Sequence, residues 1–104
     1  MANVKITVID KIARKDFQKQ YGVLDFKDND DTACDKFKIG DTFIFRSGEG
    51  VPSGFCSWAW ADIQRDVVAV KSGANFSHMK TPGTQIACCT DGLRPVFFKI
   101  ERID

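Results

Sequence analysis

The sequence predicts an α+β domain in which a small antiparallel sheet, open or curled toward a barrel, packs on one long helix. Three patterns lead to this fold class: an alternating segment at the start of the chain, an apolar stripe over residues 56–72, and a hairpin over residues 84–103. The chain has 104 residues, 43% of them hydrophobic, including nine Phe. This length and composition predict a single domain, residues 1–104, with one core.

The first part of the chain predicts one strand and one short helix. Apolar residues alternate with Lys and Thr there, which is typical of a half-buried strand: Val4, Ile6 and Val8. Residues 13–21 then predict a short helical turn, which should end at Gly22 because glycine readily terminates a helix.

The middle of the chain is mostly connecting segments. Residues 25–36 are acidic and predict a solvated loop. Residues 37–45 predict a turn that leads into a second strand. Residues 47–54 are rich in Gly, Ser and Pro and therefore predict a surface connection.

A long helix is predicted over residues 56–72. Its apolar residues repeat at intervals of four and three, which defines one stripe along the helix: Cys56, Trp60, Ile63, Val67 and Val70. Gly73 is the natural stop. Either Ser53 or Ser57 can cap the start, so the position of the first turn stays open at this point.

The C-terminal segments 84–90 and 93–103 predict a hairpin joined by Asp91-Gly92, a dipeptide typical of tight turns. A two-residue turn pairs Cys89 with Arg94 and Cys88 with Pro95.

This register separates the two adjacent cysteines. Cys89 shares a face with the apolar residues Ala87, Val96, Phe98 and Ile100, whereas Cys88 shares the other face with Ile86 and Phe97. A slip of one residue would exchange the partners of the two cysteines.

The charge balance argues against two classes of partner. The chain has 15 Lys and Arg residues against 14 Asp and Glu residues, and the basic residues are scattered. Proteins that bind nucleic acid or a membrane surface carry a basic patch, so neither partner is expected. No apolar run is long enough to span a bilayer, and the first residues lack the apolar core of a signal peptide. We therefore expect a cytoplasmic protein.

Cysteine is the residue type that most directly suggests chemistry. The four cysteines stand at positions 34, 56, 88 and 89 and form no Cys-x-x-Cys pair, so the usual signals for a zinc ribbon or a thioredoxin-like site are absent. In a cytoplasmic protein, reduced thiols or metal ligands are expected in place of disulfides. Any cysteine site must be assembled by the fold, and no complete catalytic signature decides whether the protein is an enzyme.

One hypothesis is that the cysteines converge on bound metal. Thiolates are the soft ligands of an iron–sulfur cluster or a tetrahedral zinc ion, and the full set would be Cys34, Cys56, Cys88 and Cys89. Adjacent residues in a strand point to opposite faces, which weakens the zinc version. A larger cluster, or a backbone bent near Gly92 and Pro95, would accommodate both adjacent thiols.

A second hypothesis is that one thiol is reactive. Cys56 lies in the first turn of the predicted helix, where the helix dipole favours a thiolate. Cys89 would face the cation of Arg94 across the hairpin, with the same effect. A reactive thiol also needs a base, and the single histidine, His78, lies in a loop whose position the sequence does not define.

A third hypothesis is that the cysteines are structural. Free cysteine packs as a small apolar side chain and is among the most buried residue types. The protein would then be a ligand-binding module or a homo-oligomer without catalysis.

Four further residues are candidates for a supporting role. Trp58 and Trp60 cannot share a helix face, so Trp60 fits the core stripe and Trp58 points outward near Asp62, as a pocket wall or an interface residue. Asp62 is either a surface charge of the helix or an acid–base group. Asp91 fits a turn position, and Arg94 fits a rim position where it binds an anion or pairs with an acidic neighbour.

Three blocks of sequence carry a family resemblance. The chain resembles a family of small uncharacterised prokaryotic proteins of about this length, over nearly its whole extent. The blocks are Phe55-Cys-Ser-Trp-Ala-Trp-Ala-Asp-Ile, Met79-Lys-Thr-Pro-Gly-Thr and Ile86-Ala-Cys-Cys-Thr-Asp-Gly-Leu-Arg-Pro-Val. All four cysteines fall where the resemblance places cysteines, whereas His78 stands where similar sequences tend to have an aromatic residue. The resemblance implies no activity, because the family has none assigned.

Overall fold

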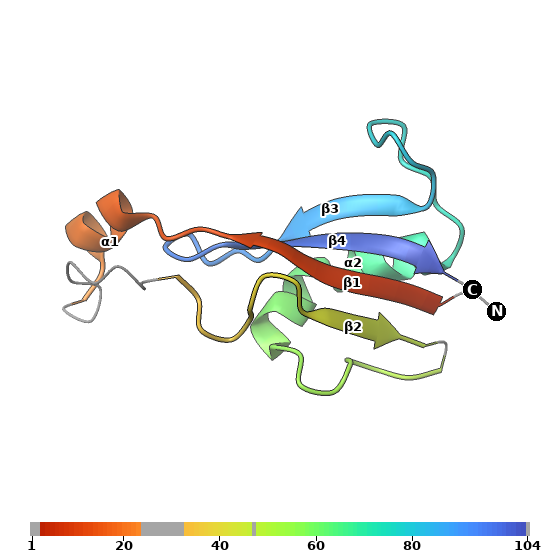
Figure 1. The fold of residues 1–104 in the computed structure, drawn as a ribbon, viewed down its shortest axis with the longest axis horizontal. Helices are drawn as coiled ribbons and strands as arrows, with labels where there is room; N and C mark the ends of the chain where they lie inside the picture. The colour runs from red at the N-terminus through yellow and green to blue at the C-terminus, as the bar shows by residue number, and fades with distance from the viewer. Residues whose placement is uncertain (1–2, 24–32, 47, 104) are drawn as a thin grey trace.

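The computed structural model describes residues 3–23, 33–46 and 48–103. Within these ranges the elements are β1 (Asn3–Lys11), α1 (Lys15–Tyr21), β2 (Thr42–Phe45), α2 (Ser57–Lys71), β3 (Thr84–Cys88) and β4 (Val96–Ile103). The strands form one antiparallel sheet in the order β2-β1-β4-β3, and α2 lies against one of its faces (Figure 1). The predicted α+β class is confirmed. The sheet is open, with β2 and β3 at its edges, and is not closed into a barrel.

The core lies between the sheet and α2. The two central strands, β1 and β4, point alternate residues at the helix, and each of these side chains is at most 1% exposed: Val4, Ile6, Val8, Val96, Phe98 and Ile100. The helix contributes Ile63, Val67 and Val70, which are fully buried. The alternation predicted for the first strand and most of the predicted helix stripe are therefore confirmed.

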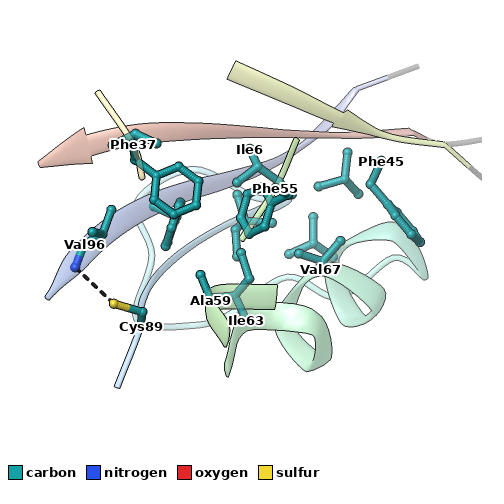
Figure 2. Close-up of a cluster of buried hydrophobic side chains, with 14 residues drawn as sticks. Ile6, Phe37, Phe45, Phe55, Ala59, Ile63, Val67, Cys89 and Val96 are labelled. Atoms are coloured by element: carbon teal, nitrogen blue, oxygen red, sulfur yellow. Dashed lines mark hydrogen bonds between the residues drawn. The ribbon is translucent and has the colours of Figure 1, made fainter. Parts of the chain in front are cut away.

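An aromatic cluster fills one part of this core (Figure 2). The ring of Phe98 lies 5.2 Å from that of Phe37 and 5.5 Å from that of Phe55, measured between ring centroids. Phe55 also contacts Phe43, at 4.9 Å. These rings join β4 to the connections before and after β2, so two segments without regular structure are held in the core by their aromatic side chains.

The short helix and the acidic loop precede β2. The predicted helical turn is confirmed as α1, which ends at Gly22, whose N–H donates a hydrogen bond to the carbonyl oxygen of Gln18. Residues 25–32, most of the predicted acidic loop of residues 25–36, lie outside the described residues.

The long helix begins at a cap that the sequence analysis did not consider. The N-cap of α2 is Cys56, with extended backbone and no side-chain capping bond, so neither Ser53 nor Ser57 is the N-cap. At the other end Ser72 is the C-cap, and Gly73 follows with a φ of 104°, in the left-handed region that glycine tolerates. No helix in the described ranges is both long and apolar enough to cross a membrane.

The connection between β3 and β4 is longer than predicted. The prediction of a two-residue turn at Asp91-Gly92 is wrong, because the connection covers residues 89–95. The Asp91 carboxylate accepts hydrogen bonds from the N–H groups of Leu93 (3.0 Å) and Arg94 (3.1 Å), and so closes a wider turn with its side chain.

The predicted faces of the two cysteines are nevertheless confirmed. Cys88 lies opposite Phe97 instead of Pro95, so the predicted pairs Cys88–Pro95 and Cys89–Arg94 are wrong by two residues. Side chains alternate with a period of two along a strand, and a shift of two leaves each side chain on its face. Cys89 is buried in the core and Cys88 is exposed.

One arginine joins the end of the sheet to the end of α2. The Nη1 atom of Arg102 donates to the carbonyl oxygens of Val70 (2.7 Å) and Ala74 (3.2 Å), and its Nη2 atom donates to Oδ1 of Asn75 (2.8 Å). The last carbonyls of a helix have no partner within it, so Arg102 adds a charged donor to the Val70 carbonyl at the end of α2 and to the Ala74 carbonyl just beyond it.

Candidate functional site

Three of the four cysteines line one pocket. It has a volume of about 490 Å³ and lies at the N-terminal end of α2, beside the turn between β3 and β4. Cys34 comes from the connection before β2, Cys56 from the start of α2, and Cys89 from the residue after β3. The remaining wall contains apolar residues, Phe37, Trp58, Ala59 and Val96, and polar ones, Lys36, Thr90, Asp91 and Arg94, together with Gly92.

Cys56 lies at the positive end of a helix dipole. As the N-cap of a 15-residue helix, it adjoins N–H groups that have no partner within the helix. The first turn contains no acidic residue that would offset this positive potential. The side chain is half-buried, so the thiol has partial access to solvent.

Cys89 is the most buried of the four thiols. Its Sγ atom accepts a hydrogen bond from the N–H of Val96 at 3.3 Å (Figure 2), and only 8% of the residue is exposed. Burial raises the pKa of the Cys89 thiol, while the N–H groups of Val96 and Asp91 act in the opposite direction and the charges of Asp91 and Cys34 add to the rise. The buried thiol is therefore protonated at neutral pH.

This raised pKa predicts a loss of stability at alkaline pH. Above the ordinary thiol pKa of about 8.5 the unfolded chain ionises Cys89 while the native protein keeps it protonated, so the free energy of unfolding falls as pH rises. Urea unfolding at about pH 7 and about pH 9.5 should show a smaller cost of Cys89→Ala at the higher pH. Cys88→Ala is the matched control, and an equal cost of Cys89→Ala at both pH values would contradict the prediction.

Cys34 is held at the pocket through its backbone. The Nζ atom of Lys11, on β1, donates hydrogen bonds to the carbonyl oxygens of Cys34 and Phe37, both at 3.0 Å. Phe37 is itself buried in the aromatic cluster. The segment that carries Cys34 is thus fixed by one ammonium group and one aromatic anchor.

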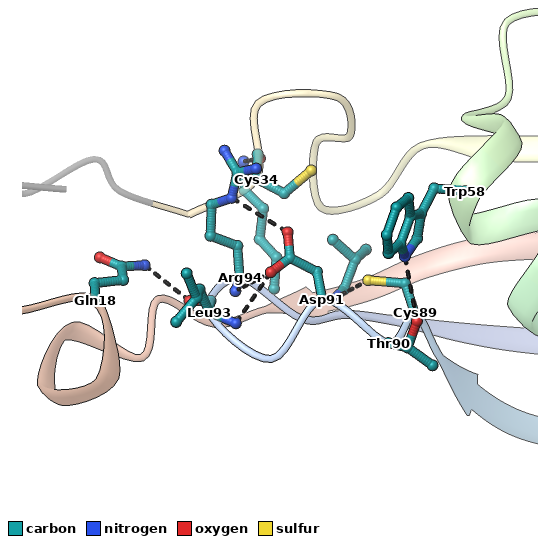
Figure 3. A network of polar contacts seen from close by, with 10 residues as sticks. Gln18, Cys34, Trp58, Cys89, Thr90, Asp91, Leu93 and Arg94 are labelled. Carbon is teal, nitrogen blue, oxygen red and sulfur yellow. Dashed lines mark hydrogen bonds and ion pairs between the residues drawn. The ribbon is translucent and has the colours of Figure 1, made fainter. Parts of the chain in front are cut away.

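A polar chain fixes the turn beside the pocket (Figure 3). The N–H of Thr90 donates to Oδ2 of Asp62 at 2.7 Å, and the hydroxyl group of Thr90 lies within hydrogen-bond distance of both carboxylate oxygens. The indole N–H of Trp58 donates to Oγ1 of Thr90 at 3.2 Å. Trp58 is 64% exposed, as predicted for a residue off the core stripe, and its ring forms part of the pocket wall.

Asp91 and Arg94 form a pair at the rim. Nε of Arg94 donates to Oδ2 of Asp91 at 3.3 Å. The backbone N–H of Arg94 also donates a hydrogen bond to the Asp91 carboxylate. The prediction that Asp91 serves the turn is confirmed. Arg94 is not paired with Cys89 between neighbouring strands, but both residues line the same pocket.

Cys88 and His78 lie elsewhere. Cys88 points to the face of the sheet opposite the pocket, and Nε2 of His78 lies 3.0 Å from Oε1 of Gln85. Among the described residues, no three Cys, His, Asp or Glu side chains are grouped closely enough to hold a metal ion. A single tetrahedral zinc ion therefore does not fit this arrangement.

Comparisons with protein families, curated proteins and solved structures found no match for the chain. The family resemblance stays a prediction, and function must be inferred from the site itself.

Proposed function

We propose that this protein carries out thiol redox chemistry in the pocket lined by Cys34, Cys56 and Cys89. The observation that carries the proposal is the convergence of these cysteines from three segments far apart in the sequence. The volume of about 490 Å³ lies in the range of small-molecule sites, so a small disulfide or another soft, thiol-reactive molecule fits beside the sulfur atoms.

The surroundings of the three thiols suit them to different roles. Cys34 and Cys56 are half-buried and reach the pocket, and Cys56 adjoins the N–H groups at the N-terminus of α2. Either thiolate would attack one sulfur of a small disulfide, forming a mixed disulfide and releasing one thiolate. Cys89, kept protonated by burial, suits a later step.

Alkylation rates test this proposal. The native protein would be treated with iodoacetamide, and modification of each cysteine would be followed by peptide mass spectrometry. We expect Cys34 or Cys56 to react several-fold faster than Cys88, although Cys88 is more exposed, because a thiol activated for exchange reacts faster than an ordinary surface thiol.

The unfolded chain is the control, because all four thiols then share one environment. The proposal fails if Cys88 is the fastest thiol in the native protein and both Cys34 and Cys56 react more slowly than when unfolded. The structural reading of the cysteines, in a ligand-binding or oligomeric module without catalysis, would then be preferred.

An iron–sulfur cluster is a second candidate, favoured by the N–H groups around Cys89. Backbone N–H bonds to sulfur are typical of cluster-bound thiolates, and Sγ of Cys89 accepts one from Val96. A cluster is larger than one ion and would reach thiols that a single ion does not. Untagged protein purified without oxygen should then contain iron and sulfide in Cys88→Ser but not in Cys89→Ser. A colourless, metal-free wild-type sample would contradict this candidate.

A further inference from the structure

Two of the pocket thiols face the same space. In Figure 3 the sulfur of Cys89 points toward Asp91 in the turn after β3, and Cys34 lies on the segment before β2. Both residues line the pocket, and Cys34 is close enough for its charge to act on the Cys89 thiol. The two thiols therefore share one pocket, although 55 positions separate them in the sequence.

Both residues also lie outside the helices and strands. Cys34 precedes β2 in a segment outside the helices and strands, and its backbone is held there by the Lys11 side chain. Cys89 is the first residue after β3. Cys56 differs, because its carbonyl oxygen accepts the first helical hydrogen bond of α2, from the N–H of Trp60 at 2.9 Å. A disulfide needs its two Cα atoms within about 7 Å, and a loop residue reaches that geometry more readily than a helix cap.

We propose that Cys34 and Cys89 form a reversible intramolecular disulfide and are the redox pair of this pocket. This inference rests on the proposed thiol redox function and names the pair of cysteines that performs it. The oxidant is a small disulfide of the glutathione type.

The exchange proceeds in two steps. The Cys34 thiolate attacks one sulfur of the small disulfide, whose S–S bond breaks, so that a mixed disulfide forms on Cys34 and one thiolate leaves. The Cys89 thiol then gives up its proton to a departing thiolate and attacks Sγ of Cys34, displacing the second thiolate. Two protein thiols are oxidised to one disulfide, and the small disulfide is reduced to two thiols.

Closure of this disulfide would change access to Cys56. The new bond would tie the segment before β2 to the turn after β3, and both form walls of the pocket that contains the Cys56 thiol. We therefore expect alkylation of Cys56 to be several-fold slower in the oxidised protein than in the reduced protein. The pair would then control the third thiol of the same pocket.

Peptide mapping tests the pair directly. The full chain would be incubated with glutathione disulfide, digested without reductant and analysed by mass spectrometry. We expect a mass loss of two hydrogen atoms and one cross-linked peptide pair joining Cys34 to Cys89. The same cross-link should form in Cys56→Ser and Cys88→Ser, and it should be lost in Cys34→Ser and Cys89→Ser.

The outcomes separate this inference from the proposed function. A cross-link that includes Cys56 or Cys88, or one that joins only two chains, overturns the inference. A mixed disulfide that accumulates on a pocket cysteine without closing also overturns it but leaves thiol redox function standing. If no pocket cysteine reacts, the proposed function itself fails. The peptide map of the wild-type protein shows by itself which cysteines are joined, so the test is valid even if Cys89→Ser does not fold.

Discussion

Replacing Phe98 by Ala is expected to lower the free energy of unfolding by about 3–5 kcal/mol, as for other large aromatic residues removed from a core. Phe98 is fully buried in β4, a central strand of the sheet, and its ring contacts those of Phe37 and Phe55. The substitution would leave a cavity between the sheet and the rings of Phe37 and Phe55, which lie on the connections before and after β2. The cavity would not collapse easily, because these two rings surround it. Urea unfolding followed by Trp fluorescence measures the change.

Phe98→Leu is the matched variant for this experiment. Leucine keeps most of the apolar volume, so its cost should be well below that of alanine. Because Phe37 also lines the pocket, Phe98→Ala should expose Cys89 to alkylation more than Phe98→Leu does. A cost of less than about 1 kcal/mol for Phe98→Ala would contradict the central place of this ring in the core.

Replacing Arg102 by Met is expected to cost about 2–3 kcal/mol, because hydrogen bonds from a charged group contribute more than neutral ones. The guanidinium group donates to the carbonyl oxygens of Val70 and Ala74 and to the side chain of Asn75. Methionine keeps the apolar stem but leaves the carbonyl oxygens of Val70 and Ala74 without this donor. Thermal and urea unfolding of the two proteins would measure the difference.

Arg102→Lys separates charge from geometry. A lysine keeps the positive charge near the helix C-terminus but has one nitrogen in place of the fork that reaches three acceptors. We expect an intermediate loss of stability. If Arg102→Met changes the free energy of unfolding by less than about 0.5 kcal/mol, the contacts at the end of α2 contribute little.

The strand and helix patterns were predictable because they depend on local periodicity. Val4, Ile6 and Val8 alternate strictly, and only one face of their strand can enter a core. The same period explains why the faces of Cys88 and Cys89 were predicted correctly from a wrong register. The length of the turn was not predictable, because it depends on the Asp91 side chain, which accepts hydrogen bonds from the backbone N–H groups of Leu93 and Arg94.

The site was predictable only in part. The hypothesis of a convergent cysteine site named all four thiols, and the fold brings Cys34, Cys56 and Cys89 to one pocket while strand alternation sends Cys88 away. Nothing in the sequence signals the bond between Asp62 and Thr90, which are 28 positions apart. Such contacts depend on where α2 crosses the sheet, which is a property of the whole core.

The pairing of Asn3 with Ile103 has a practical consequence for measuring the thiols. These residues lie side by side at one end of the sheet (Figure 1), whereas Val96 and the pocket lie at the other end of β4. The eight residues of this strand span about 25 Å. A protein anchored to an electrode at the Asn3–Ile103 end of the sheet would therefore keep the pocket on the side away from the electrode, so that the potential of the pocket thiols can be measured on an immobilised sample.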